Sequence, residues 1–404
     1  MLKNPDFITA RGLLLDAVTA VETQQIPLES CAGRVLAENV AAAEHVPPFD
    51  RSPYDGYALR SEDTACASRE EPAVLYIVEE VPAGAVPTKA CTRNTAVKIL
   101  TGAPIPEGAD CVINYERTEF TESAVRIFEP VKAGSNIVRM GEDVRRGDIL
   151  ARAGQVIDAG TAGTLAAQGI ACPTVFRRPR VGILSTGNEV AEPGAPLPAG
   201  KIYNSNRFTL AAEVERLGCE PVYLGLAGDS PAAVCDRLRA GLEQCDAVLS
   251  TGGVSVGDYD FTPAAMEMAR VELLFRGVKL KPGMACACGV KDGKLVCGLS
   301  GNPASALTNF CAVVAPALKK LAGRSDFMPR EVMVTLRDRF GKKSPGTRLL
   351  RGTLDLSDGT AGMRLSGDQG NVVISSAIGC DVMAVVPAGS GPVEAGTVLE
   401  GFLL

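Results

Sequence analysis

The chain has 404 residues, and its 46% hydrophobic and 22% charged residues predict several folded domains rather than a disordered protein. Its net charge of −6 argues against general nucleic-acid binding. No apolar run approaches the roughly 20 residues of a membrane span, and the first residues lack the features of a signal peptide. We therefore expect a cytoplasmic protein with neither nucleic-acid nor membrane partners.

Histidine and cysteine usage narrows the chemistry further. The single histidine, His45, excludes multi-histidine metal sites and histidine relays, so acid–base or metal chemistry must use Asp, Glu, Lys or backbone amides. The 13 cysteines have no C-x-x-C pair. The closest spacing, Cys286-Ala287-Cys288, lacks further nearby ligands and makes a poor zinc site. We interpret these thiols as small buried residues in a reducing compartment.

The first half of the chain contains one helical pattern and one β-rich segment. Apolar residues at three- and four-residue spacing predict a helix over 10–23. From 47 to 140, short β-type runs alternate with Pro/Gly turns, which indicates a β-rich module. Its first loop, "PPFDRSPYDGYALR", cannot form a regular helix because of its prolines, and we interpret Asp55 as part of a ligand-facing turn. Residues 141–176 return to turns, a short strand and a helix, and we expect them to pack with residues 1–46 in a discontinuous domain.

The second half is predicted to be an α/β domain followed by a β domain. Over 177–327, strands alternate with helices, which predicts a mostly parallel, doubly wound sheet with helices on both faces. Asp229-Ser230-Pro231 is typical of a helix start, Gly218 of a helix end, and Asp292-Gly293 of a hairpin turn. Short strands and glycine turns over 328–404 indicate a small β-barrel or sandwich.

Three strands of the α/β pattern end in polar glycine turns, at 185–189, 251–255 and 300–303. Ligands of open α/β sheets bind outside the carboxyl ends of the strands, where such turns favour anions. Glycine as a plain helix connector is the alternative for any one turn. Four acidic residues near these turns suggest Mg²⁺ binding, and they are Glu189, Asp229, Asp258 and Asp260. Lys279 and Lys281 are either cationic contacts or solvated strand positions.

The order of the motifs DGYA, TGAPIPEGAD, RMGEDV, STGNE, NSNR, TGGVSVGDYD, KPG, SGNPAS and GDQG resembles the molybdopterin molybdenumtransferases of the MoeA type, which are related to the C-terminal domain of gephyrin. The resemblance covers nearly the whole chain. It implies an elongated, four-domain homodimer in which 1–46 with 141–176 form a helical/mixed dimerisation domain, 177–327 bind molybdopterin and 328–404 form a β-barrel. It also implies insertion of molybdate into adenylylated molybdopterin, with Mg²⁺-dependent release of AMP. Molybdopterin adenylyltransferase and acceptor molybdoenzymes are the corresponding partners.

The resemblance also assigns site residues. It implies catalytic roles for Asp55, Glu189, Asp229 and Asp260, with Glu189 and Asp229 as metal ligands, and a site completed by Asp55 of a second subunit. Together with the residue patterns it gives these cofactor-binding candidates: Thr101, Arg139, Asp143, Thr186, Gly187, Thr251, Gly252, Gly253, Ser255, Lys279, Lys281, Gly301, Asn302, Ser305, Arg348 and Arg351. Within that set we expect Arg348, Arg351, Ser255 and Ser305 to serve molybdate.

The chain departs from its family in the oxyanion region. Many members have KPGKP where this chain has Lys281-Pro282-Gly283-Met284-Ala285, LSGNP replaces LPGNP, and Asn371 follows GDQG where a serine can stand. Losing one cation from a dianion pocket costs about 1–3 kcal/mol if no neighbour replaces it. Two alternatives therefore stay open: a paralogue that uses tungstate or another altered oxyanion, and a non-catalytic cofactor carrier or scaffold. The absence of GxGxxG disfavours a nucleotide-binding oxidoreductase.

Overall fold

The computed structural model describes residues 1–254 and 261–404 of the chain. The described chain forms two compact units. The large unit contains Met1–Glu38, Ala153–Ala162 and Cys172–Leu404, and the small unit contains Asn39–Arg152 and Gly163–Ala171. The finer division into four domains stays a prediction.

A seven-stranded sheet forms the centre of the large unit, with the order β1-β17-β18-β19-β16-β12-β15. Its strands are β1 (Leu2–Lys3), β12 (Arg180–Thr186), β15 (Glu220–Ala227), β16 (Ala247–Thr251), β17 (Glu272–Arg276), β18 (Cys286–Lys291) and β19 (Lys294–Leu299). Strands β19, β16, β12 and β15 are parallel, whereas β18 is antiparallel to both of its neighbours. The predicted hairpin turn joins β18 to β19, and Asp292 and Gly293 both have positive φ, at 51° and 76°.

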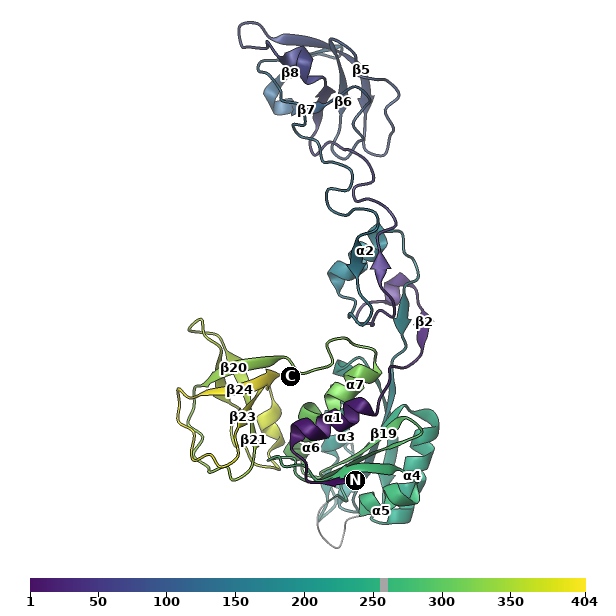
Figure 1. Cartoon of the computed structure of the whole chain (residues 1–404), viewed down its shortest axis with the longest axis vertical. Coiled ribbons are helices and arrows are strands. Elements are labelled where there is room, and N and C mark those ends of the chain that lie inside the picture. Colours follow the sequence, from purple (N-terminus) through teal and green to yellow (C-terminus); the bar gives the residue numbers. More distant parts are fainter. Residues whose placement is uncertain (255–260) are drawn as a thin grey trace. The chain divides into compact units, whose positions relative to one another are not determined.

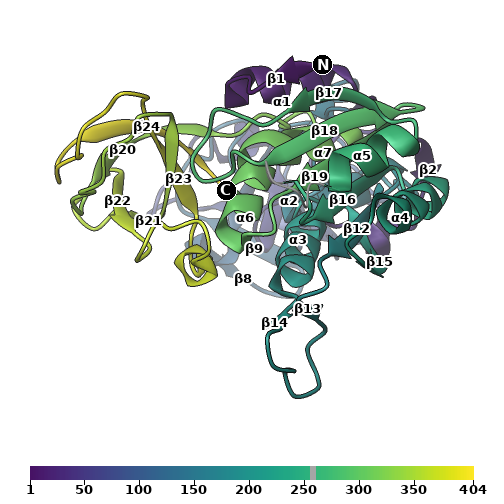
Figure 2. The same cartoon turned by 90° about the horizontal axis from the view of Figure 1, so that it is seen from below.

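Helices cover both faces of this sheet (Figures 1 and 2). One face packs against α1 (Phe7–Asp16), α3 (Ser205–Arg216), α6 (Pro303–Asn309) and α7 (Ala315–Leu321), with a π-helical turn, Phe310–Val314, between the last two. The other face packs against α4 (Pro231–Gln244) and α5 (Phe261–Met268). Each face has its own apolar core, which includes Leu14, Leu210 and Phe310 on the first and Leu224 and Leu238 on the second. The predicted α/β architecture is thereby confirmed.

The predicted helix over 10–23 is wrong at both ends. Helix α1 begins at Phe7, after Asp6 accepts a hydrogen bond from the Thr9 N–H at 2.8 Å, and it ends at Asp16. Val21 instead donates its N–H to the Leu321 carbonyl of α7, and the chain continues into β2 (Thr23–Gln25), which pairs with β11 (Thr174–Phe176). Val18 and Val21 are buried all the same, so the apolar spacing marked buried positions without fixing their secondary structure.

The predicted helix ends of α3 and α4 are confirmed. Ser230 caps α4 by accepting a hydrogen bond from the Ala233 N–H at 3.2 Å, and Pro231 occupies the first turn. After α3 ends at Arg216, Gly218 adopts φ 85°, a conformation that favours glycine. These ends place the Asp229 turn directly before α4.

The C-terminal part of the large unit is a closed barrel of five strands in the order β20-β22-β21-β23-β24, which settles the alternative between barrel and sandwich. The strands are β20 (Glu331–Leu336), β21 (Arg348–Asp355), β22 (Gly362–Leu365), β23 (Val382–Val386) and β24 (Val398–Leu403). A 3₁₀ turn, Ile374–Ala377, contacts both α6 and β21. This turn therefore lies between α6 and the barrel strand β21.

The small unit is built on a six-stranded sheet in the order β7-β4-β6-β5-β9-β8. Its strands are β4 (Gly56–Leu59), β5 (Ala73–Val81), β6 (Thr95–Ile99), β7 (Cys111–Asn114), β8 (Thr118–Phe120) and β9 (Ala124–Ile127). A Cβ at Gly56 would lie 2.0 Å from the Ile113 carbonyl oxygen, so only glycine fits after Asp55.

The remaining elements are short. They are β3 (Val40–Ala41), which pairs with β10 (Ile149–Ala151), β13 (Val190–Ala191), which pairs with β14 (Ile202–Tyr203), and α2 (Ala159–Ala167). Within the described ranges, no helix has the length and apolar character needed to cross a membrane.

Candidate functional site

The glycine turns meet at one edge of the sheet. Strands β12, β15, β16 and β19 are parallel neighbours, so the turns that follow them lie side by side at their carboxyl ends. Thr186 and Thr251 end two of these strands and are buried, and the Thr186 hydroxyl donates to the Thr251 carbonyl at 2.9 Å. The sequence-predicted convergence of the turns is present in the structure.

The first turn lies against the acidic turn after β15. The Asn188 N–H donates to Asp229 Oδ2 at 3.0 Å, which ties the two turns together. Gly187 has φ 128°, and a Cβ there would lie 2.5 Å from Glu189 Oε2, so the Glu189 carboxylate is folded back over the glycine. Glu189 is exposed and Asp229 is half-buried. Both carboxylates are thus held at the same edge and remain open to solvent.

The second and third turns are packed backbone against backbone. A Cβ at Gly252 would lie 2.5 Å from Thr186 Oγ1, and one at Gly301 would lie 3.6 Å from the Gly252 Cα. The N–H of Gly252 donates to the Leu299 carbonyl at 3.0 Å and is not free for a ligand. Within residues 1–254 and 261–404, the N–H groups of Gly253 and Gly301 have no protein acceptor. Those two N–H groups can donate to a ligand.

Helix α3 contributes a residue that the sequence interpretation did not select. The Asn206 side chain is buried and donates to the Gly301 carbonyl at 2.9 Å, while its Oδ1 has no hydrogen-bond partner among the described residues. A buried, unpaired amide oxygen is costly unless a ligand satisfies it. Asn206 is therefore a candidate acceptor for an N–H group of a ligand, and only the NSNR motif pointed toward it.

A second group of site residues lies where α6 meets the barrel. Arg351 of β21 is completely buried (0% exposed), and its guanidinium donates only to neutral oxygens. The acceptors are the Ser376 hydroxyl at 2.9 Å, the Gly370 carbonyl at 3.3 Å and the Thr308 hydroxyl at 3.5 Å. No carboxylate among the described residues forms an ion pair with it, and burial lowers its pKa. A guanidinium in this setting strongly favours a bound anion.

Arg348 is a second, similar cation on the same strand. It is 5% exposed, donates Nε to the Ser344 hydroxyl at 3.2 Å and lies 5.1 Å from the centre of the Phe340 ring. Burial lowers its pKa as well, and no carboxylate among the described residues pairs with it. Among the described residues, neither of these two buried guanidinium groups on β21 forms an ion pair with a carboxylate.

Backbone contacts bring Lys281 and Ser305 to these arginines. The Lys281 N–H donates to the Thr347 carbonyl at 2.9 Å, and the Leu349 N–H donates to the Lys281 carbonyl at 3.0 Å. The Ser305 N–H donates to the Asn371 carbonyl at 3.3 Å, next to the GDQG loop that contacts Arg351. Lys281, Ser305, Arg348 and Arg351 thus form one cluster, which we call the arginine cluster.

Helix α6 joins the arginine cluster to the glycine turns. Asn302 caps this helix directly after the third glycine turn, and Ser305 and Thr308 follow within the same short helix. Lys279 is different: its N–H donates to the Pro5 carbonyl, and no hydrogen bond among the described residues links it to the arginine cluster. Met284 is 57% exposed. Ser255, Asp258 and Asp260 lie outside the described residues.

The remaining predicted residues, Asp55, Thr101, Arg139 and Asp143, lie in the small unit. Asp55 Oδ1 accepts hydrogen bonds from both the N–H and the hydroxyl of Thr101, each at 2.7 Å, and these bonds lower the pKa of Asp55. Arg139 forms an ion pair with Asp50 at 2.7 Å. Asp143 is exposed, and its N–H donates to the Val46 carbonyl. Asp55 and Glu189 belong to different units.

The structure bears on both the predicted metal ligands and the cysteines. Within the described ranges, no three His, Cys, Asp or Glu side chains are grouped so that they could hold a metal ion. Glu189 and Asp229 therefore have no third such side chain grouped with them in the part of the chain that the structure describes. Ten of the 13 cysteines are buried and all are free thiols, as the interpretation of them as small core residues requires.

Comparisons with known proteins give the family. Residues 6–169 match the model of the MoeA N-terminal region (domain I and II), and residues 182–320 match that of a probable molybdopterin-binding domain. A molybdopterin molybdenumtransferase of Staphylococcus epidermidis is 34% identical over 95% of this chain and 91% of its own length. The chain belongs to the MoeA family of molybdopterin molybdenumtransferases.

Other members of the MoeA family agree with this assignment. The molybdopterin molybdenumtransferase of Staphylococcus aureus is 34% identical over 93% of this chain and 90% of its own length. The crystal structure of the molybdopterin biosynthesis protein MoeA from Pyrococcus horikoshii is 31% identical, with a TM-score of 0.85 over 99% of this chain and 100% of that one. The family resemblance and the fold class expected from the sequence are confirmed, and the roles of individual residues stay predictions.

Proposed function

We propose that this chain is a molybdopterin molybdenumtransferase that inserts molybdate into adenylylated molybdopterin and releases AMP. The activity of its relatives, which are molybdopterin molybdenumtransferases, and the match to a probable molybdopterin-binding domain support this activity. The single observation that carries it is the pair of buried arginines, Arg348 and Arg351, which form no ion pair with a carboxylate among the described residues. Helix α6 connects them to a glycine-turn edge suited to phosphates. A non-catalytic cofactor carrier or scaffold does not require buried cations of this kind.

The glycine-turn edge is the proposed site of the adenylylated pterin. Gly253 and Gly301 offer N–H donors to phosphate oxygens, and Asn206 offers an unpaired acceptor to the pterin. Five other residues shape this edge rather than contact the substrate, and they are Thr186, Gly187, Thr251, Gly252 and Asn302. Gly252 already uses its N–H within the protein, and a side chain at that position would collide with Thr186.

The arginine cluster is the proposed site of molybdate. Molybdate is a tetrahedral dianion, and two guanidinium groups with nearby hydroxyls match its charge and its oxygen acceptors. Arg348 and Arg351 would neutralise it, Lys281 would add a third positive charge, and Ser305 a hydroxyl donor. Because both arginines are already fixed by serine hydroxyls, at 3.2 and 2.9 Å, little reorganisation is needed on binding.

Mg²⁺ is the proposed metal. It commonly binds through one or two carboxylates and completes its shell with water and substrate phosphates, so Glu189 and Asp229 are compatible with it even without a third protein ligand. When bound, the ion would neutralise charge on the cleaved phosphoanhydride. Asp229 Oδ2 accepts the Asn188 N–H, which holds the carboxylate toward the first turn.

The proposed assembly is a homodimer whose site is completed by Asp55 of the partner subunit. Asp55 is fixed by Thr101 through two hydrogen bonds, so its carboxylate is oriented before substrate arrives. Arg139 and Asp143 would contribute from the same unit. A molybdopterin adenylyltransferase would supply the substrate, and molybdoenzymes would accept the product. Cytoplasmic location stays a prediction.

The proposal is tested with purified protein, adenylylated molybdopterin, Mg²⁺ and a titration of molybdate, with tungstate in a parallel titration. Glu189→Ala should abolish most AMP release while circular dichroism stays unchanged. Arg348→Gln should instead raise the molybdate concentration for half-maximal turnover, because one of two buried cations is lost. An unchanged molybdate requirement in Arg348→Gln, or full Mg²⁺-dependent turnover in Glu189→Ala, would refute the corresponding assignment. Half-maximal turnover at a lower concentration of tungstate than of molybdate would identify tungstate as the oxyanion substrate.

A further inference from the structure

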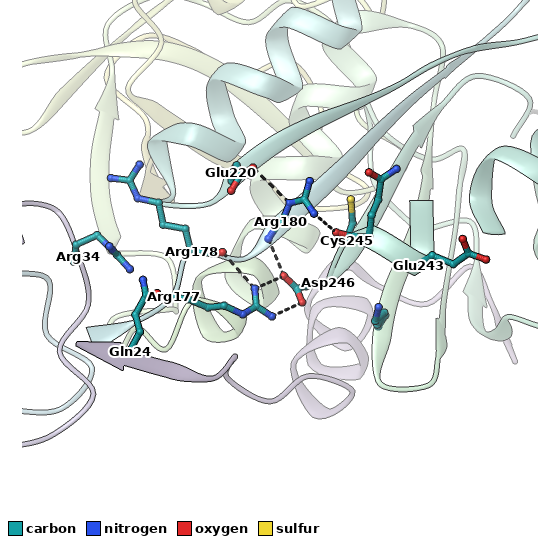
Figure 3. A pocket seen from close by; sticks show the side chains of 11 residues that line it. Gln24, Arg34, Arg177, Arg178, Arg180, Glu220, Glu243, Cys245 and Asp246 are labelled. Carbon is teal, nitrogen blue, oxygen red and sulfur yellow. Dashed lines mark hydrogen bonds and ion pairs between the residues drawn. The ribbon is translucent and has the colours of Figure 1, made fainter. Parts of the chain in front are cut away.

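A cavity of about 500 Å³ lies at the opposite edge of the sheet, where the parallel strands begin. Strand β12 spans seven residues from Arg180 to Thr186, so this cavity is about 20 Å from the glycine turns at 3.3 Å per residue. Its walls come from β2, the loop before β3, the connection from β11 to the start of β12, the end of α4 with the two residues after it, and the starts of β15 and β19 (Figure 3). The transferase chemistry proposed above does not use it.

Positive charge is in excess around this cavity although the whole chain carries −6. Five cationic side chains line it, against three acidic ones. The cations are Arg34, Arg177, Arg178, Arg180 and Lys294, and the acids are Glu220, Glu243 and Asp246. A local excess of this sign attracts anions independently of the global charge.

The acidic side chains neutralise only one side of the cavity. Arg177 makes two hydrogen bonds of 2.6 Å to Asp246, and Arg180 lies 3.4 Å from Glu220. Figure 3 shows Glu243 on the far side from Arg34 and Arg178. The paired arginines are therefore structural, and the Lys294 ammonium donates to the Leu242 carbonyl at 2.6 Å. Arg34 and Arg178 remain as the cations to be explained.

Arg34 and Arg178 face the cavity without a carboxylate. Arg34 donates to the Phe176 carbonyl at 2.9 Å, and among the described residues Arg178 has no hydrogen-bond or ion-pair partner for its side chain. Burial and then the nearby charge of Arg178 lower the pKa of Arg34, which shows that the two like charges interact. In Figure 3 both guanidinium groups lie on the same side as the Gln24 amide. Like charges held together in this way are relieved by an anion placed between them.

We propose that this cavity binds a small molecule through a phosphate or diphosphate group, held by Arg34 and Arg178 with the Gln24 amide as an additional donor. Guanidinium groups match phosphate oxygens in pairs, and the volume is within the range of about 300–1,000 Å³ that small-molecule sites occupy. This site is separate from the glycine turns and from the arginine cluster.

Residue-resolved footprinting tests the proposal without interference from anion binding at the transferase site. The full-length protein is treated with phenylglyoxal, which modifies accessible arginines, in the presence of inorganic phosphate, pyrophosphate, hexaglutamate or chloride at equal ionic strength. Peptide mass spectrometry then gives the modification rate at Arg178 and at Arg93, an exposed arginine of the small unit that serves as the control.

Phosphate or pyrophosphate should slow modification of Arg178 at least five-fold and leave Arg93 unchanged. Arg34→Gln should remove that protection, while its AMP release should equal that of the wild-type chain. No protection at 10 mM anion, which is roughly a ten-thousand-fold excess over a micromolar Kd, would overturn the proposal. So would equal protection of Arg93, which indicates charge screening, and so would protection by hexaglutamate alone, which indicates a docking site for an acidic protein segment.

Discussion

Arg351 shows how much a single buried charge constrains the chemistry of this protein. Its guanidinium is completely buried, and its hydrogen-bond acceptors are two hydroxyls and one carbonyl. Neutral acceptors hold its geometry but do not cancel its charge. The residue is therefore oriented for a partner with negative charge, and the neighbouring Arg348 strengthens that requirement.

Met284 is the residue at which this chain departs most clearly from the family pattern. Its side chain is 57% exposed and shares a cavity with Lys3 and Arg276, so a lysine at this position would not have to bury its charge. We predict that Met284→Lys lowers the molybdate concentration for half-maximal AMP release by about three- to ten-fold, equivalent to roughly 0.7–1.4 kcal/mol. Met284→Gln is the matched control and should change little.

A higher or unchanged molybdate requirement in Met284→Lys would show that the missing family lysine is not needed here. Lys3, Arg276 or Lys281 would then already provide the charge. The measurement is a molybdate titration of AMP release at fixed adenylylated molybdopterin.

At the scale of elements, the sequence predicted the features that depend on neighbouring residues and missed those that depend on tertiary contacts. The Ser230 cap, the Asp292-Gly293 turn and the glycine turns each depend on a few neighbouring residues, and the structure contains all of them. The helix expected over 10–23 ends early, at Asp16. The Val21 N–H donates to the carbonyl of Leu321, which is 300 residues away in the sequence. Likewise, the Ser376 and Thr308 partners of Arg351 come from other elements, so the sequence pattern alone could not identify them.

The ion pair between Arg177 and Asp246 fastens the connection before β12 to the start of β16. The side chains are 31% and 17% exposed, so solvent weakens the pair only in part. Burial raises the pKa of Asp246, but hydrogen bonds from Arg177 and the Arg180 N–H outweigh it, and the net pKa is lowered. The pair therefore stabilises the fold above the unfolded pKa of about 3.9, and this stabilisation is lost as pH falls through the lower folded pKa.

We predict that Arg177→Met lowers the free energy of unfolding at pH 7 by about 1–3 kcal/mol and weakens its dependence on pH below about 4. Urea unfolding at several pH values measures both effects. Arg178→Met is the control, because the adjacent Arg178 has no ion pair among the described residues, and it should stay within about 0.5 kcal/mol. Equal losses in the two variants would contradict the role assigned to the ion pair.

At the scale of the whole molecule, the predicted site residues fall in two separate units. Asp55 with Thr101 belongs to the small unit, whereas Glu189, Asp229 and the arginine cluster belong to the large one. A two-fold dimer can assemble one site from two chains, with each subunit giving Asp55 to its partner. The sequence led to this idea through the family resemblance, and no residue pattern alone could have placed the units.

Mixed dimers test the shared site. We predict that Asp55→Ala and Glu189→Ala homodimers are each inactive, whereas a heterodimer of the two chains recovers nearly half of the wild-type AMP release. One of its sites would carry both substitutions and the other neither. Differently tagged, co-expressed chains allow the heterodimer to be purified and verified. A verified heterodimer without activity would mean that both residues serve the same site from one chain.

The most direct test of the proposed transferase measures AMP and molybdenum-containing cofactor in the same reaction. The purified chain is incubated with adenylylated molybdopterin, Mg²⁺ and molybdate, and the two products are quantified over time. We predict that they form in equal amounts and that Arg351→Gln suppresses molybdenum insertion while the purified variant still binds the adenylylated pterin. Release of AMP without molybdenum in the product, or no reaction of the wild-type chain, would contradict the account.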